Sequence, residues 1–249
     1  MRFKLTYISP DGDTFSLLQG RTGPFIEEGT VAGLVGEFED TTVQTPGVPG
    51  GTVDFKDRVV SPMTGGFTVV AHDEEEWATI RQAFSTHKYG ELHLDCGNKK
   101  YWTPFRLARP LPSPELRPKV AARTAVEGVS DGPNGGVWNI RAVSPDPTVT
   151  ITNFGDVPVW PEYAWNGKGG RVTLPSGAGF NLPKVTSTHR LPLIRSNSGK
   201  IHGPNGINHD LSRITEAISE MTPVGETRTY TQPAGSNIIW NVGVLDPWN

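Results

Sequence analysis

The sequence has one cysteine, no long apolar run and little net charge, and each shortage removes a class of function. Cys96 alone can form neither an internal disulfide nor a zinc site built from several cysteines. No apolar run approaches the roughly 20 residues of a membrane-crossing helix, and the amino terminus lacks a signal-peptide core. A net charge of −3 supplies no basic patch for nucleic acid or anionic lipid. We therefore expect a soluble protein that folds in a cytoplasm, without membrane insertion or sequence-specific nucleic-acid binding.

Patterns of catalytic, cofactor and metal sites are also missing. Residues 128–132 formally match the nucleophile elbow G-x-S-x-G around Ser130, but the elbow needs a following helix, and residues 133–136 read Pro-Asn-Gly-Gly. His202 and His209 are seven residues apart, whereas a helical metal pair needs a spacing of four. No glycine-rich segment has the spacing of a phosphate loop or a dinucleotide site. We predict a protein that is not an enzyme and that holds no cofactor and no metal.

What the sequence does have is an abundance of turn-forming residues, 29 glycines and 22 prolines. They separate short segments in which apolar and polar residues alternate, such as residues 148–153 and 159–165. Alternating segments about ten residues apart, joined by such turns, are typical of β-sandwiches and jelly rolls. The predicted fold class is therefore mainly β.

Two helices interrupt this pattern. Residues 73–88 begin with Asp73 as a cap and Glu76 three residues later, and their apolar stripe continues as far as His87. Residues 210–221 carry a second apolar stripe that ends before Pro223. We expect the first helix to lie across the face of a sheet.

A proline-rich segment at residues 109–118 is the best candidate for a domain boundary. It holds four prolines in ten residues, too stiff for a helix and unable to donate to a strand ladder. We predict one domain over residues 1–118 and a second over residues 119–249, and leave open whether the last strands return to the first domain.

The loop at residues 45–52 is the first candidate functional site. It lies between two strand-like segments, residues 37–43 and 53–60, and so reads as the tip of a hairpin. A stiff tip without charge loses little entropy when it docks, so we predict that it contacts a neighbouring subunit. The residues of this predicted contact are Pro46, Gly47, Val48, Pro49, Gly50 and Gly51.

Three aromatic residues close together form the second candidate site. Trp160, Tyr163 and Trp165 lie within six residues, and strand alternation places Tyr163 and Trp165 on one face. Exposed on a sandwich, they would stack on sugar rings and make the second domain a carbohydrate-binding module. Packing inside the core of a jelly roll is the alternative reading.

With these elements placed, the chain resembles a distal tail protein of long non-contractile-tailed bacteriophages. The resemblance is carried by the hairpin loop from Pro46 to Gly51, the helix at 73–88, the strand at 101–107 and the segment 150–156 with Pro158 and Pro161. It implies a first domain like the tail tube fold, a β-sandwich with one flanking helix, and a galectin-like β-sandwich as the second. The extended segment 196–224 is similar to tail-tip proteins of phages that infect actinobacteria.

The resemblance also implies the assembly and its partners. Six copies would form a ring in the virion, at the tail tip, after synthesis in the host cytoplasm. In that family the hairpin is a belt that grips the adjacent subunit. The ring would contact the tail tube protein and the tail-associated hub or tip protein, and would pass the tape measure protein and then DNA. Host cell-wall carbohydrate is a further partner that it could touch.

Overall fold

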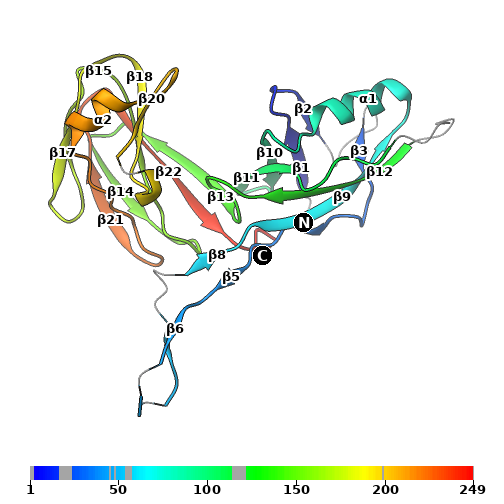
Figure 1. Ribbon diagram of the computed structural model, residues 1–249, viewed down its shortest axis with the longest axis horizontal. Helices are drawn as coiled ribbons and strands as arrows, with labels where there is room; N and C mark the ends of the chain where they lie inside the picture. Colours follow the sequence, from blue (N-terminus) through cyan, green and yellow to red (C-terminus); the bar gives the residue numbers. More distant parts are fainter. Residues whose placement is uncertain are drawn as a thin grey trace. The chain divides into compact units, whose positions relative to one another are not determined.

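The structure, a computed structural model, describes residues 3–16, 24–44, 46–47, 49–53, 58–113, 122–197 and 199–248. These residues form mostly antiparallel β-strands and two short α-helices, which confirms the predicted mainly β class (Figure 1). The chain divides into two compact units: unit 1 contains Met1–Ile140 and Val244–Asn249, and unit 2 contains Arg141–Gly243. Within the described ranges, no helix is long and apolar enough to cross a membrane.

Unit 1 is built from two groups of antiparallel strands. The first group is ordered β2 (Thr14–Ser16), β1 (Lys4–Ile8), β10 (Gly90–Asp95) and β11 (Lys100–Leu107). The second joins β12 (Ala122–Ser130) to β9 (Met63–Ala71), which also pairs with β3 (Phe25–Ile26) and β4 (Ala32–Gly33). The end of β11 pairs with β12, so the two groups are continuous.

The core of unit 1 lies between these groups and is closed by a helix. Tyr7 on β1 and Phe105 on β11 are fully buried, and the Phe105 ring stacks with Phe67 of β9 at 5.9 Å between centroids. Tyr7 stacks on Phe84 just after the helix, at 4.2 Å, and its hydroxyl donates to the Ala83 carbonyl at 3.0 Å. Burial raises the pKa of the Tyr7 hydroxyl well above its usual range, so it remains a donor at neutral pH.

Helix α1 (Glu74–Ala83) begins where predicted and ends five residues early. Asp73 caps it by accepting from the Glu76 amide at 2.8 Å. The predicted extension to Lys88 is wrong, because the Ser85 carbonyl accepts from Leu107 at the end of β11. The chain after the helix is thereby held against a strand and leaves the helical path.

Unit 2 is a two-layer β-sandwich. One sheet has the order β14 (Thr148–Thr152), β21 (Thr227–Thr231), β16 (Gly170–Thr173) and β17 (Gly179–Leu182). The other has β22 (Ser236–Val244), β15 (Glu162–Gly167), β18 (Val185–Pro192), β19 (Ile201–Gly203) and β20 (Gly206–Asn208), with a 3-10 turn at Arg195–Asn197. Tyr163 of β15 faces the first sheet, because its ring meets Phe180 of β17 edge-on and its hydroxyl donates to the Thr231 carbonyl.

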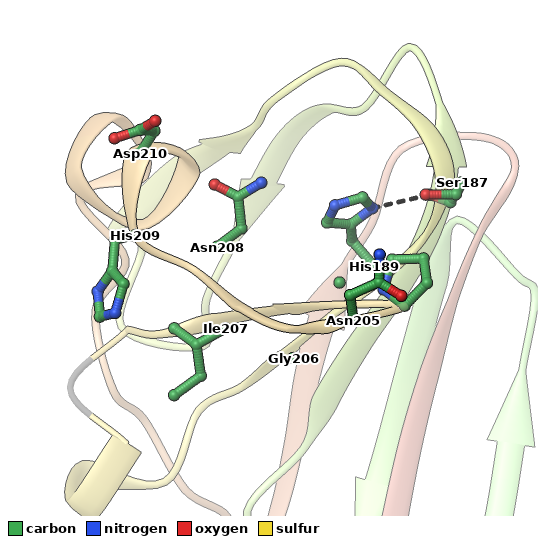
Figure 2. A pocket seen from close by; sticks show the side chains of 10 residues that line it. Ser187, His189, Asn205, Gly206, Ile207, Asn208, His209 and Asp210 are labelled. Atoms are coloured by element: carbon green, nitrogen blue, oxygen red, sulfur yellow. Dashed lines mark hydrogen bonds between the residues drawn. The ribbon is translucent and has the colours of Figure 1, made fainter.

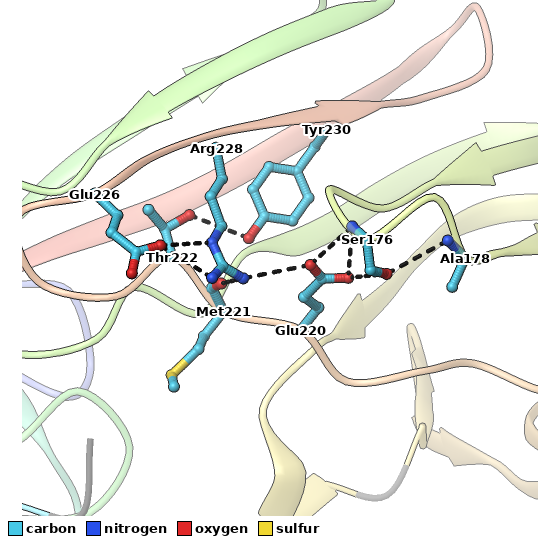
Figure 3. A network of polar contacts seen from close by, with 8 residues as sticks. All are labelled: Ser176, Ala178, Glu220, Met221, Thr222, Glu226, Arg228 and Tyr230. Atoms are coloured by element: carbon cyan, nitrogen blue, oxygen red, sulfur yellow. Dashed lines mark hydrogen bonds and ion pairs between the residues drawn. The ribbon is translucent and has the colours of Figure 1, made fainter. Parts of the chain in front are cut away.

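Helix α2 (His209–Thr215) covers only half of the predicted second helix. Glu216 has a φ of +50°, which ends the helix, and Ile214 is left exposed. The following chain is instead anchored by Glu220, whose carboxylate accepts from the amide and hydroxyl of Ser176 and pairs with Arg228 of β21 (Figure 3). This anchoring replaces the last turns of the predicted helix.

The boundaries between the units lie after Ile140 and after Gly243, and not at residue 118. β12 pairs with β9 along its whole length, so residues 122–130 belong to unit 1. The chain leaves unit 1 within β13 (Trp138–Ser144) and re-enters it at the end of β22. Trp248 then packs edge-on against Phe3 at 5.3 Å and Trp138 at 6.3 Å. Part of the proline-rich segment, residues 114–118, lies outside the described residues.

Candidate functional site

The predicted hairpin is present as a two-segment arm, residues 37–60. Its base pairs β5 (Phe38–Glu39) with β8 (Val59–Val60), and its outer part pairs β6 (Thr42–Val43) with β7 (Thr52–Val53) (Figure 1). Every described residue from Phe38 to Thr52 is exposed to solvent. The described residues from Phe38 to Thr52 are therefore not part of the core of their own chain.

The glycines of the arm tip are required by its local geometry. Gly47 and Gly50 have φ angles of +82° and +87°, a region that other residues rarely occupy, and neither has a neighbour within 4 Å of an added Cβ. At Gly51 an added Cβ would lie 2.0 Å from the Thr42 methyl across the hairpin. Pro46 and Pro49 are exposed beside them. Val48 of the predicted contact lies outside the described residues, as does Thr45.

Two apolar side chains of the arm are largely uncovered by the described part of the chain. Val43 and Val59 are each 60% exposed, so covering them with another surface would be favourable. The Arg58 guanidinium lies 3.7 Å above the Phe38 ring and hydrogen bonds both carboxylate oxygens of Asp40, at 2.7 and 3.2 Å. Through these contacts, Arg58 on the returning side of the arm is linked to Phe38 and Asp40 on the outgoing side.

Residues 54–57, which join β7 to β8 on the returning side of the arm, lie outside the described residues.

The predicted carbohydrate surface of aromatic residues is wrong. Tyr163 and Trp165 do share a face, but it is the inner one: their exposed fractions are 0% and 2%. The Trp165 indole donates to the Pro183 carbonyl at 2.8 Å. Trp160 is half-buried. The rings of Tyr163 and Trp165 are part of the core of the sandwich, so they cannot stack on a sugar from solvent.

The position of Ser130 does not match a nucleophile elbow. Ser130 ends β12, is fully buried, and its hydroxyl lies 2.6 Å from the Thr103 hydroxyl. The amide of Gly136 donates to the same oxygen at 3.3 Å, so Ser130 ties a turn to the sheet. Across the described ranges, no group of three or more His, Cys, Asp or Glu side chains is arranged to hold a metal ion.

One hollow in unit 2 was missed by the sequence analysis. It lies between β18 and the β19–β20 hairpin, and His189 and His209 are in its wall (Figure 2). The sequence shows these histidines twenty residues apart in a glycine-rich stretch, with no signal of the strand pairing that brings them to one place.

Comparison with known proteins identifies the fold. No protein-family profile matches the chain, and no curated protein matches it by sequence. The chain is similar to the SPP1 Dit protein, described as a paradigm of hub adsorption apparatus in Gram-positive infecting phages: TM-score 0.54 and 11% identity, over 98% of this chain and 100% of that one. It is also similar to a chain of the phage P2 baseplate in its activated conformation with Ca, with TM-score 0.55 and 7% identity over 97% and 98% of the two chains. A P2 baseplate structure with Sr gives 0.52 and 8%, over 94% and 98%. Along nearly its whole length, the chain has the fold of the phage Dit and baseplate hub proteins.

Proposed function

We propose that this chain is a structural protein of a bacteriophage tail, a distal tail protein whose six copies form a ring between the tail tube and the tail tip. The observation that carries the proposal is the extent of the fold similarity, over 98% of this chain and 100% of SPP1 Dit. Because both units are included, the similarity covers the whole arrangement of strands and is not confined to one common sandwich.

The arm is the proposed contact between neighbouring copies. Its ladders are two-stranded, so each strand has an outer edge with backbone groups available to extend a neighbour's sheet. Docking would also bury Val43 and Val59, and because 60% of each is exposed, each would contribute roughly 1–2 kcal/mol if fully covered. Pro46 and Pro49 each fix one φ angle of the tip, which reduces the entropy lost on docking.

In this proposal the ring is a connector in the virion and not an enzyme. One face binds the tail tube protein and the other binds the hub or tip protein. The central channel passes the tape measure protein and then DNA without reading its sequence. The net charge of −3 agrees with a passage that does not retain a polyanion. Assembly takes place in the host cytoplasm.

The test combines mass in solution with negative-stain images of the purified chain. The proposal expects a hexameric annulus, and a monomer at high concentration would contradict the ring. Val43→Asp together with Val59→Asp places two charges where docking would bury methyl groups, so assembly should weaken while the fold is kept. Val224→Asp, at an exposed turn of unit 2, is the matched control and should leave the mass unchanged. An unchanged hexamer in the double variant would refute the role of the arm.

A further inference from the structure

A hollow of about 470 Å³ in unit 2 has the features of a small binding site. It is bounded by β18 on one side and by the β19–β20 hairpin and the first residues of α2 on the other (Figure 2). Its volume falls within the range of about 300–1,000 Å³ common for small-molecule pockets. The side chains with polar groups in its wall are Ser187, His189, Asn205, Asn208, His209 and Asp210.

His189 provides a fixed hydrogen-bond acceptor in this hollow. Only 7% of the residue is exposed, and its Nδ1 lies 2.8 Å from the Ser187 carbonyl. A carbonyl only accepts, so Nδ1 carries a proton, and in the neutral form of the imidazole Nε2 is the acceptor. Nε2 has no hydrogen bond to the described residues. The space beside it exists because residue 203 is glycine: a Cβ there would lie 3.0 Å from Nε2.

Asn208 provides a fixed donor opposite this acceptor. Its Oδ1 accepts from the Leu211 amide at 3.0 Å and so caps α2, which determines the orientation of the amide group. The amide nitrogen is therefore the free end, and it points to the side of His189 (Figure 2). The side chains of Asn205 and Asp210 also form no hydrogen bond with the described residues.

Trp165 supports His189 from inside the sandwich. The two residues are direct partners across β15 and β18, and their rings lie 6.0 Å apart. Trp165 is itself held by its bond to Pro183. The buried tryptophan is thus a positioning residue for the imidazole and does not contact the hollow's contents.

The chemistry of the wall limits what it can bind. No lysine or arginine lines it, and the formal charge at neutral pH is that of Asp210, so a phosphate, sulfate or carboxylate ligand is disfavoured. His189 and Asp210 offer hydrogen-bond acceptors, and Asn208 offers a donor. Hydroxyl groups both donate and accept, so neighbouring hydroxyls on a sugar ring can bond to all three residues.

We propose that this hollow binds a neutral sugar residue of a polysaccharide. Its open mouth leaves room for the rest of the polymer to continue into solvent. The inference is independent of the ring proposal, because the site lies wholly within unit 2 and needs no second copy.

The test is an NMR titration of the protein, labelled with ¹⁵N in its amides. The ligands are the methyl glycosides of glucose, galactose, mannose and N-acetylglucosamine, and glucuronate is the anionic comparison. At least one neutral glycoside should shift amide signals of residues 187–210 and bind more tightly than glucuronate. Its oligosaccharides should bind more tightly than the methyl glycoside. The absence of binding by every neutral glycoside, a preference for glucuronate, or equal affinity of monomer and oligosaccharide would each overturn the proposal.

Two variants separate this site from a general surface effect. Asn208→Asp keeps the cap on α2 but removes the donor, and Gly203→Ala fills the space beside His189; each should weaken binding by about tenfold or more. Asn181→Asp, exposed on β17, is the matched control and should bind as the unaltered chain does. Unchanged affinity in both site variants would place the sugar elsewhere. The mass of the same samples reports the ring separately, so either proposal can fail alone.

Discussion

Replacing both Gly47 and Gly50 with alanine should weaken assembly without lowering the stability of the fold. Both residues have positive φ angles and open space around an added Cβ, so the change adds backbone strain and no steric clash. The left-handed region costs an L-residue roughly 1–2 kcal/mol, or about 2–4 kcal/mol for the pair. At about 1.4 kcal/mol per factor of ten, the population with the native tip falls roughly 30- to 1,000-fold.

A matched pair of glycines in unit 2 makes this prediction specific. Gly177 and Gly235 have φ angles of +86° and +83° and also lack neighbours within 4 Å, so alanine there introduces the same strain into turns of the sandwich. Calorimetry should show a melting temperature lowered by several degrees for the unit 2 pair and an unchanged one for the arm pair. Light scattering across a range of concentrations should show weaker assembly for the arm pair and unchanged assembly for the unit 2 pair.

The reasoning would be refuted by equal melting temperatures combined with equal assembly in the two double variants. It would also be refuted if the arm pair lowered the melting temperature as much as the unit 2 pair, because the arm would then be part of the core.

Three further predictions concern the fold. Arg106 hydrogen bonds Asp131 and lowers the pKa of that carboxyl, so the ion pair stabilises the fold above pH about 4 and this stabilisation is lost as the pH falls further. Asp131→Asn should lower the free energy of unfolding by about 1–2 kcal/mol in urea at pH 7 and make stability depend less on acid pH. Gly128→Ala would place a Cβ 2.0 Å from the Phe105 ring and should destabilise unit 1 by about 1–3 kcal/mol, whereas an unchanged calorimetric transition would show that the ring moves freely. Trp165→Phe removes a buried indole hydrogen bond and should cost about 1 kcal/mol in thermal unfolding, with equal stability excluding that bond as a contribution.

The sequence predicts local features of this fold better than the long-range ones. The start of α1 is correct because its signal, Asp73 with Glu76, lies within one turn. Its end is set by the bond from Leu107 to Ser85, which no local pattern reports. The proline-rich segment suggests a boundary for the same reason, since no local pattern reports the pairing of β12 with β9, which joins residues far apart in the chain.

The candidate sites show the same limit. The hairpin and its glycine tip follow from turn chemistry, and both are present. Alternation correctly places Tyr163 and Trp165 on one face, but a period of two does not say which face is covered by a second sheet. The hollow around His189 depends on the register between β15, β18 and β19, which no local pattern in the sequence indicates.

The connectivity of the units has a consequence for synthesis on the ribosome. Residues 141–243 leave the exit tunnel before residues 244–248, whose Trp248 packs beside Phe3 and whose Leu245 carbonyl accepts from the Gly36 amide at 2.8 Å. The strands of unit 1 therefore come together only after the segment that follows unit 2 has been made. Because unit 2 is one continuous segment, Arg141–Gly243, recombination at two junctions could exchange it and leave both segments of unit 1 in place.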